Sequence, residues 1–306
     1  ASQDLIIQEG TFDVNGNTLT VSGTGSTFVV QDGGALELQG GETITAPTLQ
    51  DGSRVVYDGT ASAYTLKSYA YERLEVNGNA ATTFTFPDAN ITVDERLYVT
   101  SGILAFDGDK NLAVNDSVST GTAIEIAANG RLMNTGTGDL TLGGGVTNAG
   151  TVLFNSSDNA GNGIALTSTS AASNRNWQGA GTFFFRDVTV SDQQCTGGTP
   201  AAISAYSSTD GSGDNTNWTF GEAANFTWIG ESGTDTNWGT AANWQGGSAP
   251  GSSDTAIFDG NISNESCTIA AAATAAGVTV TNNYSGTITQ SGASTLTAII
   301  ADSALA

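Results

Sequence analysis

The chain contains no histidine, and its only cysteines are Cys195 and Cys267. Without an imidazole it cannot form Ser-His-Asp or Cys-His nucleophile systems, bind zinc through histidine or use a histidine general base. Two cysteines are also too few for a tetrahedral structural zinc site. In an oxidising compartment the two thiols would form one disulfide, and the alternative is two separate buried thiols. These absences exclude whole classes of hydrolytic and zinc-dependent chemistry.

Basic residues are scarce too, since Lys and Arg total 8 against 30 Asp and Glu, for a formal net charge of −22. Neutralising phosphates requires clustered cations, so nucleic acid is excluded as a partner. Enzymes that cleave polysaccharides on a parallel β-helix need paired carboxylates beside an Arg or Lys. None of the Lys or Arg residues lies in a recognisable acid–base sequence motif of this kind, so we predict that the chain is not an enzyme. The eight cations are Arg54, Lys67, Arg73, Arg96, Lys110, Arg131, Arg175 and Arg186.

The sequence also lacks an apolar run of about 18 residues, the length that a membrane-spanning helix requires. We therefore expect no membrane span. No basic segment followed by an apolar segment opens the chain, and its Ala-Ser-Gln-Asp start suits a mature terminus left by signal cleavage. An acidic surface would keep a secreted, repetitive β protein soluble.

Short strands are what the sequence does have. Glycine is abundant, at 40 of 306 residues, and short apolar triplets, most of them with a polar middle residue, recur between turns of Gly, Asn and Asp. An apolar-polar-apolar triplet buries one face of a very short strand. Examples are residues 12–14, 19–21, 36–38, 74–76, 91–93, 97–99, 112–114, 124–126 and 140–142.

The close, regular recurrence of these triplets favours a chain that keeps turning the same way over one that doubles back in hairpins. A single coil loses more backbone entropy than its few buried side chains return, so coils must stack to be stable. We predict an all-β fold with a right-handed parallel β-solenoid over residues 1–220. Tandem antiparallel β-sandwiches are the alternative.

A smaller, tryptophan-rich β module is predicted over residues 221–306. Trp228, Trp238 and Trp244 belong to it. If they were exposed in a row they would stack on sugar rings, and otherwise they anchor a core. The strand pattern of the first region starts again at residues 278–280 and 296–300, so this module runs into a partial solenoid.

Residues 71–76, 83–87 and 91–93 resemble the rungs of large secreted bacterial β-solenoid proteins. The phrases around Trp228, Trp238, Trp244 and residues 254–258 are similar to modules of autotransporter-like and adhesin-like surface repeat proteins. The resemblance implies an extracellular β-helical protein with a structural or adhesive role, and it brings no catalytic residues with it.

Two acidic loops are weak candidates for calcium binding, and no other cofactor is expected. Asp107, Asp109 and Asn111 have the spacing that opens a calcium loop, but Leu112 stands where glycine is needed. Asp210 and Asp214 form a looser cluster in a Gly/Ser loop. The alternative for both is a polar corner of the solenoid.

These features predict a structural protein, a subunit or segment of a bacterial surface fibre, filament or sheath. Copies of the chain would join head to tail through strand edges and solenoid ends. The predicted joining residues are Leu5, Ile6, Ile7, Leu296, Ile299 and Ile300. The alternative function is a carbohydrate-binding adhesin domain of a longer surface protein, with surface glycans as partners.

Overall fold

The computed structural model describes residues 3–106, 108–156, 163–206, 208–221, 225–231, 235–245, 247–251, 254–291 and 294–300. The fold is nearly all β, and its strands form a parallel β-solenoid of about 12 turns. The chain separates into two compact units, which comprise Ala1–Ser204 with Thr209–Thr219, and Ala205–Ser208 with Phe220–Ala306. Within the part that the structure describes, no helix has both the length and the apolar character needed to cross a membrane.

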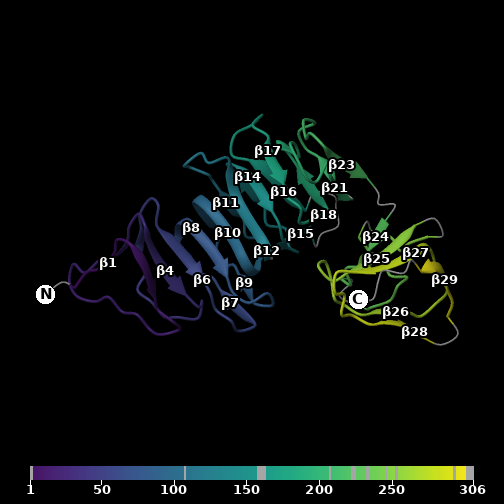
Figure 1. The fold of residues 1–306 in the computed structure, drawn as a ribbon, viewed down its shortest axis with the longest axis horizontal. Coiled ribbons are helices and arrows are strands. Elements are labelled where there is room, and N and C mark those ends of the chain that lie inside the picture. Colours follow the sequence, from purple (N-terminus) through teal and green to yellow (C-terminus); the bar gives the residue numbers. More distant parts are fainter. Residues whose placement is uncertain are drawn as a thin grey trace. The chain divides into compact units, whose positions relative to one another are not determined.

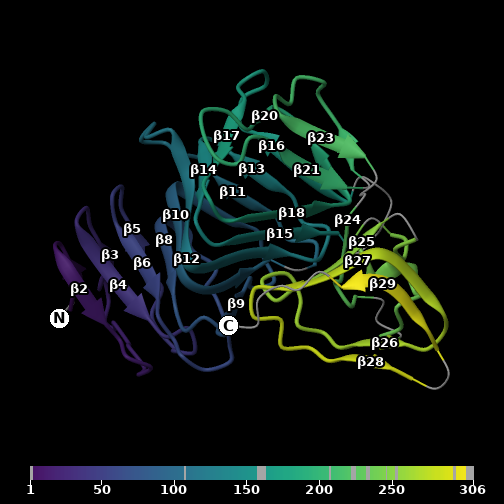
Figure 2. The same ribbon diagram turned by 45° about the vertical axis from the view of Figure 1, so that its right-hand side comes forward.

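In the first unit the strands of successive turns form three stacks (Figures 1 and 2). The first stack contains β1 (Leu5–Ile7), β3 (Phe28–Val30), β5 (Thr48–Leu49), β11 (Leu112–Val114), β13 (Leu140–Leu142), β16 (Ile164–Ser168), β19 (Val188–Val190) and β22 (Thr209–Asp210).

The second stack contains β2 (Gly10–Asp13), β4 (Gly34–Leu38), β6 (Arg54–Tyr57), β8 (Ala70–Asn77), β10 (Ile91–Ala105), β12 (Thr122–Asn134), β14 (Gly145–Asn148), β17 (Arg175–Gln178) and β20 (Gln193–Gln194). The long strands β8 and β10 begin in the first stack, and β10 and β12 continue into the third. The third stack also holds β7 (Ala63–Thr65), β9 (Thr83–Thr85), β15 (Thr151–Asn155), β18 (Thr182–Arg186), β21 (Ile203–Tyr206) and β23 (Trp218–Gly221).

Alternation along these short strands explains the core. On the second stack, one inward position is occupied by an apolar residue in seven consecutive turns, and the residues pair in register and are all 0% exposed: Leu36, Val55, Leu74, Leu97, Ile124, Val146 and Trp177. Burying one such side chain stabilises the fold by about 1.5–3 kcal/mol. Because this burial repeats from turn to turn, the stacked coils gain the stability that a single coil would not have.

The second unit continues parallel pairing over a different core. β24 (Asn225–Thr227), β25 (Thr255–Asp259), β27 (Ala273–Thr281) and β29 (Leu296–Ile300) form one sheet, and β26 (Cys267–Ile269) pairs with β28 (Ile288–Gln290). A short 3-10 turn, η1 (Ala241–Asn243), precedes Trp244. Three tryptophans and Phe258 pack at the centre of this unit.

The predicted parallel β-solenoid is confirmed. Every pairing between named strands that the described residues show is parallel, whereas antiparallel sandwiches would place neighbouring strands in opposite directions. The alternative fold is therefore wrong.

Candidate functional site

Three arginines form a column on the outer surface of the second stack. Arg54 pairs in register with Arg73, and Arg73 with Arg96, so β6, β8 and β10 present one guanidinium each at the same position of three successive turns. These are three of the eight cations in a chain of net charge −22. Like charges on directly neighbouring strands repel, so this arrangement requires compensating groups around it.

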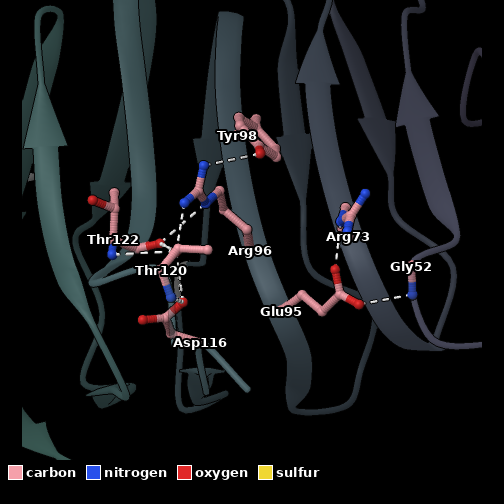
Figure 3. A network of polar contacts seen from close by, with 8 residues as sticks. All are labelled: Gly52, Arg73, Glu95, Arg96, Tyr98, Asp116, Thr120 and Thr122. Carbon is pink, nitrogen blue, oxygen red and sulfur yellow. Dashed lines mark hydrogen bonds and ion pairs between the residues drawn. The ribbon is translucent and has the colours of Figure 1, made fainter. Parts of the chain in front are cut away.

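Glu95 compensates Arg73, and a β-bulge places it there. The register between β8 and β10 shifts between Val93 and Arg96, because β10 carries one residue more than β8 at this point. Glu95 is only 2% exposed. Its carboxylate accepts a hydrogen bond from Gly52 N at 2.7 Å and pairs with Arg73 Nε (Figure 3). The buried carboxylate thereby holds the Arg73 guanidinium in one orientation.

Arg96 is held by hydroxyl and carbonyl groups, and no ion pair to it is present among the described residues. Its Nε donates to Thr122 O at 3.1 Å, and its terminal nitrogens donate to Tyr98 Oη at 3.2 Å and to Thr120 Oγ1 (Figure 3). The guanidinium carbon lies 5.6 Å from the centroid of the Tyr98 ring, within the range of a cation–π contact. Asp116 accepts from Thr120 Oγ1 at 2.8 Å and so fixes that hydroxyl. Every nitrogen of Arg96 is thus engaged.

Arg54 and Arg73 keep donors that the protein does not use. Arg54 Nη1 pairs with Glu75 Oε2 at 3.0 Å, and Thr100 Oγ1 donates to the other oxygen of Glu75 at 3.0 Å. Beyond these contacts and the Arg73–Glu95 pair, no described residue accepts from the remaining nitrogens of Arg54 or Arg73. Their side chains are 45% and 38% exposed. The column thus presents free guanidinium N–H groups to solvent.

A surface depression of about 400 Å³ lies beside these two arginines. Glu75 and Tyr98 line it with Arg54 and Arg73, and its other walls are the small residues Gly10, Thr11, Gly33, Gly34, Ala35 and Gly52. A side chain cannot replace Gly34, because a Cβ there would lie 2.4 Å from Ile7 O. The depression therefore combines cationic donors, a carboxylate acceptor, one aromatic ring and exposed backbone.

A second group of acidic residues lies near Arg54, and Arg54 affects the pKa of one of them. Burial, together with the neighbouring Asp58 and Asp13 carboxylates, raises the pKa of Glu37, while Arg54 acts in the opposite direction. Burial and Asp13 also raise the pKa of Asp58. These acids partly offset the positive charge of the column at its β4 side.

The three tryptophans, for which the sequence left sugar stacking and core packing open, are core residues. Trp228, Trp238 and Trp244 are 0%, 3% and 0% exposed. Their rings pack on one another and on Phe258, and two of their indole N–H groups are used internally, since Trp228 Nε1 donates to Glu265 O at 2.9 Å and Trp244 Nε1 to Trp238 O at 2.6 Å. A ring with no exposed face cannot stack on a sugar, so the sugar-binding hypothesis for these residues is wrong.

The calcium candidates lie in polar corners. Asp109 pairs with Lys110, which also pairs with Asp88, and Asn111 accepts from Asp139 N at 2.8 Å on the next turn. Asp107 lies outside the described residues. Within the described chain no group of three or more Asp, Glu or Cys side chains is placed to hold a metal ion. Calcium binding stays a prediction.

The second acidic loop is held by its own hydrogen bonds. Asp210 accepts from Gly213 N at 2.8 Å and from Asn215 Nδ2 at 2.6 Å, while Asp214 accepts from Ser212 Oγ. These contacts belong to the turn between β22 and β23.

Both cysteines carry free thiols. Cys195 lies in the first unit, where it donates to Pro200 O at 3.1 Å, and Cys267 belongs to the tryptophan core of the second. The disulfide that the sequence left open is not formed. Burial raises the pKa of the Cys267 thiol to about 12 and also raises that of Cys195.

The predicted joining strands both lie at edges. β1, with Leu5, Ile6 and Ile7, pairs only with β3 among the described strands, and β29, with Leu296, Ile299 and Ile300, pairs only with β27. Ile6 is 47% exposed. β1 belongs to the same turn as β2, whose Gly10 and Thr11 line the depression beside the arginines.

Sequence reasoning missed the arginine column, although a signal for it is present. The phrases Arg54-Val-Val-Tyr, Arg73-Leu-Glu-Val and Arg96-Leu-Tyr-Val repeat one pattern, an arginine followed by apolar, variable and apolar residues, about one coil apart. Aligning them by turn predicts that the three arginines stack.

Comparison with family models, curated proteins and solved structures found no match for this chain.

Proposed function

We propose that this chain is a structural protein, a solenoid rod that grows by adding strand β29 of another copy to its β1 and β2 edge. One observation carries the proposal: among the described strands β1 pairs only with β3 and β2 only with β4, so the outer sides of both have no partner strand. Unpaired strand edges accept further strands through main-chain hydrogen bonds.

The side chains at this edge support strand addition. Among the described residues, Ile6 is one of three large apolar side chains with strong exposure, at 47%. It borders a groove of about 740 Å³ formed by residues of β1, the following corner and β2. Covering the groove with a strand would remove apolar surface from water at about 25 cal/mol per Å².

The free edge of β29 suggests which strand would be added. β29 ends the second unit's sheet with β27 on one side only, as far as the described strands show. A contact between two different edges is heterologous, and a heterologous contact that does not close into a ring produces a filament. The partner in this proposal is therefore a second copy of the chain, and the product is a fibre or sheath outside the cell, where the acidic composition would keep its surface soluble.

The test compares two substitutions of equal chemistry. Ile6→Lys places a charge on the edge, where it opposes strand addition, and Val118→Lys changes an apolar residue of similar exposure, 49%, that lies outside the named strands. Light scattering across a concentration series should show concentration-dependent growth for the unmodified chain and Val118→Lys, and monomers for Ile6→Lys. Monomers in all three, or equal growth in all three, would contradict the proposal.

A further inference from the structure

The arginine column has a composition that the structural role does not require. A solenoid rod is stabilised by its inward rows, and an outward row needs only to be soluble. Stacking three guanidinium groups in register costs electrostatic energy, and the fold offsets that cost with a β-bulge, a buried carboxylate and the Tyr98 ring. The surroundings hold Arg73 in a fixed orientation and leave its terminal nitrogens free.

We propose that the depression beside Arg54 and Arg73 binds a carboxylate-bearing sugar unit of an acidic glycan. A guanidinium with two free N–H groups matches a carboxylate in a paired geometry. Arg54 and Arg73 both line the depression and are partly exposed, so their unused donors are within reach of a ligand there. The carboxylate of the ligand would lie against these two residues.

The rest of the lining selects a sugar acid over a simple anion. Glu75 lines the same depression and offers carboxylate oxygens, which repel an anion but accept hydrogen bonds from hydroxyl groups. Tyr98 adds an aromatic ring, and Thr11 adds a hydroxyl. A ligand with one carboxylate and several hydroxyls satisfies both kinds of group, whereas phosphate satisfies only the arginines.

The geometry also favours a glycan over an acidic peptide. The other walls of the depression are glycine and alanine, and no large aliphatic side chain lines it. A peptide gains affinity from apolar anchors in pockets, which this depression does not offer. Glu95 is a positioning residue in this account, because it contacts Arg73 and Gly52 and does not line the depression.

The experiment measures binding by calorimetry to a hexamer of 1,4-linked uronic acid, to its neutral methyl ester and to hexaglutamate. The acid should bind, with weaker affinity as salt rises, and the ester should not. Arg73→Gln should weaken binding at least about tenfold, the loss expected for one charge-assisted contact. Lys110→Gln removes a cation from another corner and should leave binding unchanged.

Several outcomes would overturn the inference. These are no binding of the acid at millimolar concentration, equal binding of the ester, equal or tighter binding of hexaglutamate, or full affinity in Arg73→Gln. Should Arg73→Gln fail to fold, the comparison of acid with ester on the unmodified chain decides alone. Repeating the binding assay on Ile6→Lys, which should not assemble, separates glycan binding from filament growth, because this substitution leaves Arg54 and Arg73 unchanged.

Discussion

The two units of the chain build their cores in different ways from the same parallel strands. In the first unit one inward position is filled by Leu, Val or Ile in six successive turns and by Trp177 in the next, and each residue pairs in register with its equivalent on the neighbouring turn. In the second unit Trp228, Trp238, Trp244 and Phe258 form one cluster with aromatic contacts in several directions. The row of the first unit repeats from turn to turn, whereas the tryptophans and Phe258 of the second unit form a single local cluster.

The difference implies that the two units respond differently to substitutions that remove core side chains. In a row, stability is close to a sum of turns and their interfaces, so removing a methyl group weakens one interface. In a cluster, one ring supports every other, so its removal affects the whole unit. Each unit holds one buried free cysteine, Cys195 in the first and Cys267 in the second. The rate at which each thiol reacts therefore reports the opening of its own unit.

The largest effect is expected from Trp244→Ala. Trp244 is 0% exposed and contacts Trp228, Trp238 and Phe258. Truncating such a ring costs about 3–5 kcal/mol. Labelling with a thiol reagent should then modify Cys267 rapidly while Cys195 stays protected. Equal exposure of both thiols would show that the two units unfold together and would remove the distinction between them.

A smaller effect is expected from Ile124→Val, in the row between Leu97 and Val146. Removing one methylene from a packed core costs about 0.5–1.5 kcal/mol. The labelling rate of Cys195 should rise severalfold, and that of Cys267 should not change. A loss of more than about 3 kcal/mol would mean that the row is as cooperative as the cluster.

The smallest effect concerns Glu37 and pH. Its pKa in the folded protein is raised above the ordinary value of 4.5 by burial and by Asp58 and Asp13. The folded state therefore binds a proton more tightly than the unfolded state, so this group's contribution falls as pH rises from 4.5 through the folded pKa. Glu37→Gln should stabilise the first unit slightly at about pH 7, by less than about 0.5 kcal/mol, and give no gain at about pH 4.

Glu125→Gln is the matched control for this measurement, since Glu125 lies on the same stack and is exposed. Denaturant titrations at about pH 4 and about pH 7 should show the pH-dependent difference for Glu37→Gln only. A larger gain at the lower pH would mean that the folded protein holds the Glu37 proton less tightly than the unfolded chain does.

The buried row of the first unit could be predicted from the sequence, whereas the tryptophan cluster of the second unit could not. Triplets such as Leu36-Glu37-Leu38 and Leu97-Tyr98-Val99 alternate in a way that only a half-buried short strand satisfies, and they lie in β4 and β10. The tryptophans carry no such periodicity, because their burial depends on which residues the fold brings around them. Sequence therefore left open whether they bind sugar or fill a core.

The pairing register between strands of neighbouring turns could not be predicted from the sequence either. The segments beginning at Phe12 and Phe106 have similar sequences, but Phe12 lies in β2 of the second stack, whereas Phe106 follows the part of β10 that belongs to the third. The bulge that buries Glu95 shifts β10 by one residue, and no local sequence pattern predicts this bulge. The pairing of Arg73 with Glu95 thus follows from register, which the sequence does not specify.

Fibre diffraction from concentrated, aligned protein tests the structural role most directly. Head-to-tail addition of parallel coils predicts filaments whose strands repeat along the fibre axis at about 4.8 Å, with filaments absent from Ile6→Lys and present in Val118→Lys. Protein that stays monomeric at every concentration, or filaments that form equally well from Ile6→Lys, would contradict it.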